Sequence, residues 1–402
     1  MSQTTPQTIT GPAAKKIIKK YRLLANLDVK RWYDNLARGS PITAEVRLRR
    51  VNHFCEVHGM TLTELAELAI RDIKTLTDLI EDHVAWMERE GYSPGYIKST
   101  VIAIKSWLHH HDIEIKRRIK IANFDSTPTL ENERVPEPHE LAEVFNRASL
   151  RVAASIALIG KAGLRPESLG NYNATDGLMI KDLPDLVIHQ GEAKWIQTPP
   201  LIIVRKTLSK AKHQYFTFIT NLGAKKLLAY FNDRLARGEI LVADSPVIAP
   251  DSIYKTYRGN NANKKFLPTS RICREIRETL RPRFQWRPYV FRAFFDTQML
   301  IAESRGKIAH DFRVFFMGHK GSIEAKYTTN KGILPTSLLN EMREAFKRSE
   351  VFLDLEVKEE DSLLKQKEQI QNIIQQANPE QLGKVLKMLN NLGIGNPNPS
   401  KE

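Results

Sequence analysis

Three short passages of this 402-residue chain contain side chains that together could act on a phosphodiester. They are residues 163–169 (GLRPESL), 289–295 (YVFRAFF) and 316–327 (FMGHKGSIEAKY). Phosphodiester cleavage concentrates negative charge on the non-bridging oxygens, which the planar, paired donors of Arg165 and Arg292 could stabilise. The ring of His319 could donate a hydrogen bond or move a proton. The hydroxyl of Tyr327 could attack the phosphorus and form a phosphotyrosyl intermediate, which keeps the energy of the broken bond and needs no ATP for resealing.

Each of these residues alone also has an ordinary structural explanation. Arg165 could be a surface or salt-bridge residue, His319 a helix-end residue, and Tyr327 a half-buried packing residue. Arg292 is more informative because it lies among three phenylalanines on an apolar helix, where a charge must be paired or serve a site. All four together, in this order along the chain, are hard to obtain by chance.

The charge of the chain indicates a polyanionic partner. The formal net charge is +15 and the sequence pI is about 9.6, which favours this reading over that of a generally basic proteome. Residues 255–287 hold ten Lys and Arg against two acids, a density that is costly unless phosphates neutralise it. The residues predicted to contact DNA are Arg117, Lys212, Lys264, Lys265, Arg271 and Arg274.

Several other classes of site are not indicated by the sequence. No apolar run approaches the length of a transmembrane helix, and the N-terminus lacks the apolar core of a secretion signal. Cys55 and Cys273 lie too far apart to suggest a disulfide framework or a zinc site, which fits a reducing cytoplasm. Adjacent histidines at 109–111 would point in different directions on a helix, and no nucleotide-binding glycine loop is visible. We therefore expect no metal and no cofactor.

The elements that must position the reactive residues fall into five predicted segments. They are a basic, disordered leader (1–27), a helical DNA-binding domain (28–120), a linker (121–138), a catalytic domain (139–349) and a tail with an amphipathic helix (350–402). Apolar residues recur at helical spacing over 42–58 and 94–108, and Ser93-Pro94 is typical of a helix start. β-like runs at 186–189, 201–206 and 214–220 interrupt the catalytic domain, and the last two flank SKAKH as a hairpin.

The three passages resemble the motifs of the tyrosine recombinase/integrase family of the phage type, with a divergence similar to that of an archaeal or archaeal mobile-element branch. Gly163-Leu164-Arg165 and Leu169 match the first motif, Arg292 matches the arginine of the second, and Met317-Gly318-His319 is similar to the third. Tyr327, the last tyrosine of the chain, takes the place of the nucleophile. The resemblance implies a site-specific recombinase that cleaves and rejoins DNA through a 3′-phosphotyrosyl intermediate and integrates or excises a mobile element.

The chain departs from the family pattern at three places. Ser168 stands where the family usually has an acid, and Glu167 lies one residue earlier. Tyr289 occupies the His or Lys position of the second motif, and we include it among the catalytic residues on that ground. Tyr327 lies eight residues after His319 rather than the usual nine, a change that could reshape the loop before the nucleophile.

The family also places a general-acid lysine on a β-hairpin between the first two motifs. The predicted hairpin of this chain lies in the corresponding place. Lys210 is our choice for the general acid because it lies at the tip, before the returning strand. Lys206 and Lys212 are the alternatives, and all three could instead only contact the DNA backbone.

The resemblance implies a mostly α fold with a small β-sheet. A helical core-binding domain and a mixed α/β catalytic domain would form a C-shaped clamp around duplex DNA attachment sites. It also implies a homotetramer on DNA, in the cytoplasm with the nucleoid, and a tail beyond residue 350 that serves assembly. Two alternatives are a type IB topoisomerase, which uses similar chemistry on one strand, and a DNA-binding protein that keeps the fold but has lost catalysis.

Overall fold

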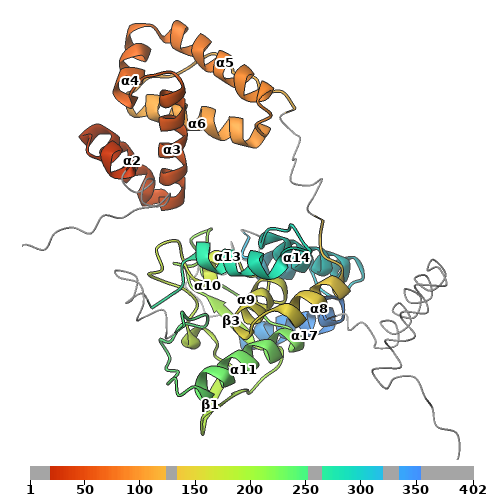
Figure 1. Ribbon diagram of the computed structural model, residues 1–402. Helices are drawn as coiled ribbons and strands as arrows, with labels where there is room; N and C mark the ends of the chain where they lie inside the picture. Colours follow the sequence, from red (N-terminus) through yellow and green to blue (C-terminus); the bar gives the residue numbers. More distant parts are fainter. Residues whose placement is uncertain (1–18, 124–133, 252–264, 320–334, 355–402) are drawn as a thin grey trace, which may run out of the picture. The chain divides into compact units, whose positions relative to one another are not determined.

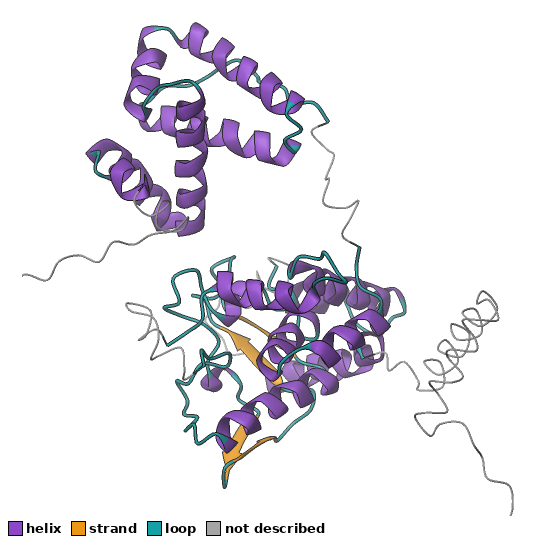
Figure 2. Cartoon of the chain, in the orientation of Figure 1, coloured by secondary structure: helices purple, strands orange, loops and turns teal. Residues whose placement is uncertain are grey.

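The computed structural model of the chain describes residues 19–123, 134–251, 265–319 and 335–354. The chain divides into two compact units. The N-terminal unit comprises residues 1–134 with 172–175, and the C-terminal unit comprises residues 135–171 and 176–402. Figure 2 shows that the strands lie in the C-terminal unit, whereas the N-terminal unit is built of helices and loops.

The N-terminal unit is a helical domain whose helices begin at well-formed caps. Its helices are α2 (Leu27–Gly39), α3 (Pro41–Val57), α4 (Leu62–Arg71), α5 (Ile73–Arg89) and α6 (Pro94–His110). Thr61 and Glu64 form a capping box at the start of α4. The predicted helix start at Ser93-Pro94 is confirmed, because the Ser93 side chain accepts a hydrogen bond from the Tyr96 backbone and Pro94 is the first helical residue.

Trp107 is at the centre of the N-terminal core. Its side chain is fully buried on α6, and its indole N–H donates to the carbonyl of Leu62 at 2.8 Å. Trp32 of α2 meets it edge to face, with ring centroids 5.2 Å apart. The helices therefore pack on one another through the apolar faces that the sequence periodicity predicts.

The C-terminal unit is built around α9, an apolar helix. Its helices are α8 (Pro138–Arg147), α9 (Leu150–Gly160), α10 (Pro166–Leu169), η1 (Ile180–Asp182), α11 (Asn221–Ala236), α13 (Thr269–Leu280), α14 (Tyr289–Ser304), α15 (His310–Phe316) and α17 (Thr336–Leu353). Every residue of α9 from Val152 to Gly160 is buried, because α11, α13 and α14 all pack against it. Figure 1 shows α9 lying between α14 and α11. The turn after α9 thereby emerges from a rigid, buried element.

The strands form two separate antiparallel pairs rather than one small sheet. β1 (Leu186–His189) pairs with β2 (Glu192–Trp195), and β3 (Leu201–Val204) pairs with β4 (Tyr215–Phe218). The mostly α fold with little β structure and the hairpin around SKAKH are confirmed. The sequence analysis missed β2, a four-residue strand in which exposed charged residues alternate with apolar ones.

The last described helix docks onto the start of α11 through two carboxylates. Asp354 accepts hydrogen bonds from the Thr220 hydroxyl at 2.7 Å and from the Leu222 backbone at 2.9 Å. Glu350 accepts from the backbone and the side chain of Asn221, both at 3.0 Å. Burial and the nearby Asp354 raise the pKa of Glu350 to about 7. α17 thus continues past residue 350, where the tail was predicted to begin, and its last turn is part of the C-terminal unit.

Other parts of the sequence prediction fall partly or wholly outside the described residues. Most of the predicted leader and of the predicted linker lies there, as does the amphipathic segment of the tail. Within the described ranges, no helix is both long and apolar enough to cross a membrane.

Candidate active site

The guanidinium of Arg292 joins the three passages that the sequence analysis singled out. Arg292 lies in the first turns of α14 and is 6% exposed. One of its terminal nitrogens donates to the carbonyl of Gly163, and the other donates to the carbonyl of Met317 at 2.5 Å. A planar fork of donors can bridge two backbone segments in this way, whereas a lysine ammonium has no such geometry. Carbonyl oxygens of the other two passages therefore compensate part of the buried charge of Arg292.

Two glycines allow these backbone segments to approach the arginine. Gly163 and Gly318 both have positive φ, at +70° and +59°. A Cβ on Gly163 would lie 2.6 Å from the ring of Phe295, and a Cβ on Gly318 would lie 2.5 Å from the ring of Tyr215. Glycine is therefore needed at both positions for conformation and for space. The glycines of GLR and MGH are structural requirements of the junction around Arg292.

Arg165 lies near this junction, and no described residue pairs with its charge. It occupies the N-cap position of α10, directly after the buried Leu164, and its side chain is half-buried. Among the described residues, its guanidinium forms no hydrogen bond and no ion pair. Burial lowers the pKa of Arg292, and the positive charge of Arg165 lowers it further. Two arginines whose charges interact, neither of them paired with a described acid, form a site that favours an anion.

His319 follows Gly318 and lies within reach of both positive charges. Its backbone N–H donates to the carbonyl of Val314 at 3.2 Å, which continues the end of α15. The pKa of His319 is lowered, first by partial burial of the ring and then by the charges of Arg292 and Arg165. The ring is therefore neutral at neutral pH and presents one donor and one acceptor.

Tyr289 lies close enough to Glu167 and Arg165 to interact with both charges. Tyr289 is the first residue of α14 and is 46% exposed. Its pKa is raised by burial and then by the negative charge of Glu167, while Arg165 and Arg292 act in the opposite direction. Glu167, which lies one residue before the family's usual acid position, is thus close to Tyr289. Tyr289 stays protonated at neutral pH.

Ser168 contacts the loop of the β3–β4 hairpin. Its buried hydroxyl donates to the carbonyl of Leu208 at 3.4 Å. The loop is also held at its base by Arg205, which donates to the carboxylates of Asp176 and Asp182 and to the carbonyl of Gly177. β3 ends at Val204, earlier than predicted, because the next residue turns away to make these contacts.

The three candidate lysines of the loop are all exposed. Lys206, Lys210 and Lys212 lie between the two strands, and Lys212 has a positive φ of 61°. Loop residues Leu208 and Ser209 are buried and separate Lys206 from Lys210. The loop therefore presents its lysines outward while it is anchored beside Arg165 through Ser168.

Tyr215 is a residue of this neighbourhood that sequence reasoning missed. It begins β4, is 2% exposed, and its ring contacts the Cβ position of Gly318. Its hydroxyl lies within reach of the Arg292 guanidinium, and its proton has no acceptor among the described residues. Burial raises the pKa of Tyr215, while the charges of Arg292 and Arg165 lower it. A tyrosine in a strand pattern carries no sequence signal for this position, because strands favour aromatic residues everywhere.

The remaining predicted residues divide into three groups. Tyr327 and Lys264 lie outside the described residues. Arg117 is paired with Asp78 and Glu81, and Arg271 is paired with Glu275, so acids already neutralise part of their charge. Lys212, Lys265 and Arg274 form the third group and have exposed side chains, as Arg117 also does.

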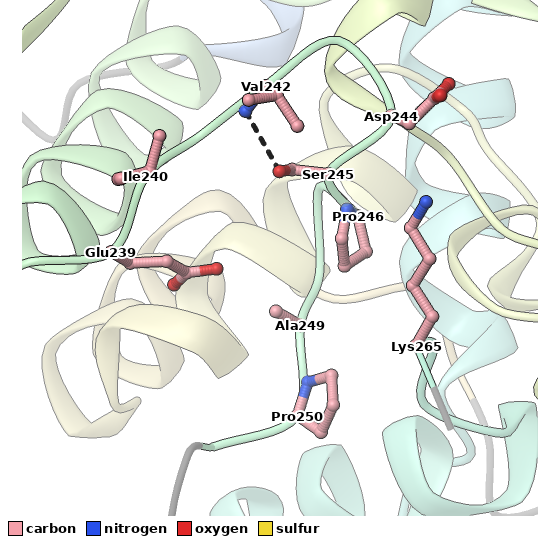
Figure 3. Close-up of a pocket in the computed structure, with 9 residues that line it drawn as sticks. All are labelled: Glu239, Ile240, Val242, Asp244, Ser245, Pro246, Ala249, Pro250 and Lys265. Carbon is pink, nitrogen blue, oxygen red and sulfur yellow. Dashed lines mark hydrogen bonds between the residues drawn. The ribbon is translucent and has the colours of Figure 1, made fainter. Parts of the chain in front are cut away.

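A cavity of about 300 Å³ lies away from the three passages. It is lined by the segment after α11 and by Lys265, which Figure 3 shows extending along one wall toward Asp244. Lys265 also helps to lower the pKa of Asp244, after the larger effects of Lys181. None of the reactive residues lines this cavity, so we do not assign it a role in the chemistry. Nor does any group of three or more His, Cys, Asp or Glu within the described ranges form an arrangement that could hold a metal ion.

Comparison with known proteins gives matches among solved structures only. No protein-family model matches the chain, and no curated protein matches it. The chain is similar to XerA recombinase, with 18% identity, a TM-score of 0.32 and coverage of 79% of this chain and 96% of that chain. It is also similar to XerH site-specific recombinase bound to difH substrate, with 14% identity, a TM-score of 0.38 and coverage of 66% and 68%.

A third match is the Tn1549 transposon integrase in complex with transposon right end DNA. The identity is 14%, the TM-score is 0.37, and the match covers 78% of this chain and 98% of that chain. Because these identities and TM-scores are low, we infer the function from the residues of the site and not from these similarities.

Proposed function

We propose that the chain is a tyrosine site-specific recombinase that cleaves and rejoins double-stranded DNA and integrates or excises a mobile element. The observation that carries the proposal is the bridge made by Arg292. A buried guanidinium joins the carbonyls of Gly163 and Met317, and so gathers Arg165 and His319 around one point. That described residues of three passages far apart in the sequence lie together supports the proposal.

In the proposed reaction, Arg165 and Arg292 bind the non-bridging oxygens of the scissile phosphate. Their charge stabilises the transition state more than the ground state because negative charge grows on those oxygens. Arg165 has the free donors for this role, and Arg292 is fixed in place by its two carbonyls. His319, neutral at neutral pH, adds a hydrogen bond or relays a proton.

The covalent step transfers the phosphoryl group from DNA to Tyr327. The Tyr327 oxygen attacks the phosphorus as its proton passes to His319 or to solvent, the bond from phosphorus to the 5′ oxygen breaks, and a 3′-phosphotyrosyl ester forms. The leaving 5′ oxygen takes a proton from Lys210, with Lys206 and Lys212 as the alternatives. In rejoining, a 5′ hydroxyl of the same or another strand attacks the ester and Tyr327 is released. No external energy source or cofactor is needed, since the ester conserves the energy of the broken bond.

Recombination between two sites would require several active sites on one DNA assembly. We propose a homotetramer on paired attachment sites. The exposed Lys212 and Arg274, and the basic excess of residues 255–287, would contribute contacts to DNA phosphates.

Two alternatives lead to different products. A type IB topoisomerase would relax supercoiled DNA as a monomer and would not exchange strands between two duplexes. A DNA-binding protein that has lost catalysis would form no covalent adduct; the unusual Tyr289 and the shifted Glu167 are the features that favour it. The bridge by Arg292 and the unpaired Arg165 favour an active enzyme, since binding alone does not require a buried arginine at this point.

The experiment that tests the proposal uses duplexes of randomised sequence, each with a nick that traps a covalent adduct. Adducts are captured under denaturing conditions, and the trapped DNA is sequenced to define a preferred site. Two labelled duplexes carrying that site are then incubated with the protein. We expect Holliday junctions and exchanged products. Relaxation of supercoiled plasmid without exchange would favour the topoisomerase, and no adduct on any duplex would contradict the proposal.

A further inference from the structure

The hydroxyl of Tyr215 is a buried polar group that lies within reach of the Arg292 guanidinium, and its proton has no acceptor among the described residues. The side chain is only 2% exposed, at the first position of β4. Buried hydroxyls in folded proteins almost always make a hydrogen bond, and one that does not needs an explanation. The ring itself is well placed, because it packs against Gly318 and lies near His213, with ring centroids 6.0 Å apart.

The position of the hydroxyl can be located from its neighbours. The ring carbon that carries the oxygen, Cζ, lies 2.5 Å from where a Cβ on Gly318 would be. Gly318 directly follows Met317, whose carbonyl receives the bond from Arg292. The phenol group of Tyr215 therefore lies at the same junction as the Arg292 guanidinium, and the charge of Arg165 also reaches it.

Most of the polar groups gathered there are hydrogen-bond donors. A guanidinium has five N–H donors and no acceptor, and Arg165 uses none of its donors on a described residue. Two donors of Arg292 bind the carbonyl oxygens of Gly163 and Met317, which are therefore already engaged as acceptors. The O–H of Tyr215 adds one more donor to this set. What such a cluster lacks is an oxygen that is rich in negative charge.

We propose that the Tyr215 hydroxyl donates a hydrogen bond to a non-bridging oxygen of the scissile phosphate, as a third donor beside Arg165 and Arg292. This inference rests on the proposed function and names a further catalytic residue of the same site. The phenol stays protonated, because burial raises its pKa, and so it can donate. Tyr215 begins β4, directly after the loop that carries the lysine proposed as general acid. A phosphate bound by Tyr215 would therefore lie near that loop.

The test uses Tyr215→Phe, which removes the oxygen and keeps the ring against Gly318. We expect the rate of adduct formation on a nicked duplex to fall about 10²- to 10³-fold, the effect typical of losing one preorganised donor. DNA affinity should be unchanged within a few fold. Thermal stability should change little, because the O–H proton that the variant removes has no acceptor among the described residues.

Tyr230→Phe is the matched control. Tyr230 is also a buried tyrosine of the C-terminal unit, on α11, but its hydroxyl accepts a hydrogen bond from the Ala249 backbone at 3.2 Å. Removing that oxygen leaves the Ala249 N–H without its partner. The control should therefore lose thermal stability and keep its cleavage rate, the opposite of what we expect for Tyr215→Phe.

A modified substrate separates direct contact from an indirect effect. A methylphosphonate at the scissile position replaces one non-bridging oxygen by a methyl group, in either of two stereochemical forms. The defect of Tyr215→Phe should largely disappear with the form that lacks the accepting oxygen and persist with the other. The same defect with both forms would overturn the proposal, because the hydroxyl would then act without touching either oxygen.

The remaining outcomes are also decisive. If Tyr215→Phe cleaves at the wild-type rate while wild type forms the adduct, this inference is wrong and the proposed function stands. If a Tyr327→Phe variant keeps the adduct and loses it only when Tyr215 is also replaced, Tyr215 is the nucleophile and not a donor. If wild type forms no adduct with any duplex, the proposed function fails and this inference fails with it.

Discussion

Replacing Gly318 by alanine tests the packing that holds the third passage in place. The residue has φ of +59°, and an added Cβ would lie 2.5 Å from two ring carbons of Tyr215. Gly306 offers a matched control in the same unit, because its φ is +68° and a Cβ there would meet nothing within 4 Å. Both substitutions force an L-residue into the left-handed region, and only one of them creates a collision.

The two costs can be separated by their magnitudes. The left-handed conformation costs roughly 1–2 kcal/mol for an L-residue, and both variants should show this loss. Overpacking in a filled core adds about 1–3 kcal/mol, which applies to Gly318→Ala alone. Gly318→Ala should therefore be less stable than Gly306→Ala by about 1–3 kcal/mol. It should also lose most cleavage activity, since His319 is the next residue and the carbonyl that receives Arg292 is the one before.

Urea unfolding of the full chain measures the first effect, and adduct formation on a nicked duplex measures the second. In a Tyr215→Ser background the ring is gone, and the cost of Gly318→Ala should fall to that of the control. Equal destabilisation by the two alanine variants in the wild-type background would refute the collision. A cost at Gly318 that is independent of Tyr215 would show that another group opposes the Cβ.

Three further predictions follow from described contacts. Arg165→Ala should slow adduct formation about 10²- to 10³-fold with little loss of stability, because its guanidinium has no partner among the described residues to leave unpaired; a near wild-type rate would remove it from the site. Glu350 has a folded pKa raised from 4.5 to about 7, so the folded state binds the extra proton and stability is lost as pH rises through that range, by up to about 3 kcal/mol. Glu350→Gln should thus be more stable than wild type at pH 8 and not at pH 5 in thermal melts, and an advantage independent of pH would contradict the assignment. Truncation after Asp354 should keep single-site cleavage and impair recombination of paired sites. Truncation after Glu350 also removes the docked carboxylate of Asp354, so it should in addition lower the melting temperature. Identical melting temperatures of the two truncated proteins would argue against the docking.

The junction of the three passages was predictable because it depends on residue types with few ordinary explanations. A charge among phenylalanines had to be paired or functional, and the four reactive residues in this order were hard to obtain by chance. The β3–β4 hairpin was predictable for a similar reason, since two β-rich runs flanked a short basic loop. In these cases a local pattern was enough.

What the sequence did not reveal depends on partners that are distant along the chain. Nothing near Arg205 indicates that it would bind Asp176 and Asp182 and so end β3 early. The position of the Tyr215 hydroxyl at the junction depends on packing against Gly318, a residue more than a hundred positions later. Ser168 looked only like a departure from a family motif, yet its hydroxyl holds the lysine loop. Such roles arise from tertiary contacts, which periodicity and spacing do not encode.

The measurement that tests the central claim most directly is adduct formation by wild type and by Tyr327→Phe on the same pool of nicked duplexes. The substitution removes the proposed nucleophilic oxygen and little else, so DNA affinity should be nearly unchanged. Wild type should give a protein–DNA band that survives denaturation, with the DNA fragment attached to the peptide that contains Tyr327. Tyr327→Phe should give none. An adduct that persists in the variant, or that maps to another residue, would contradict the claim.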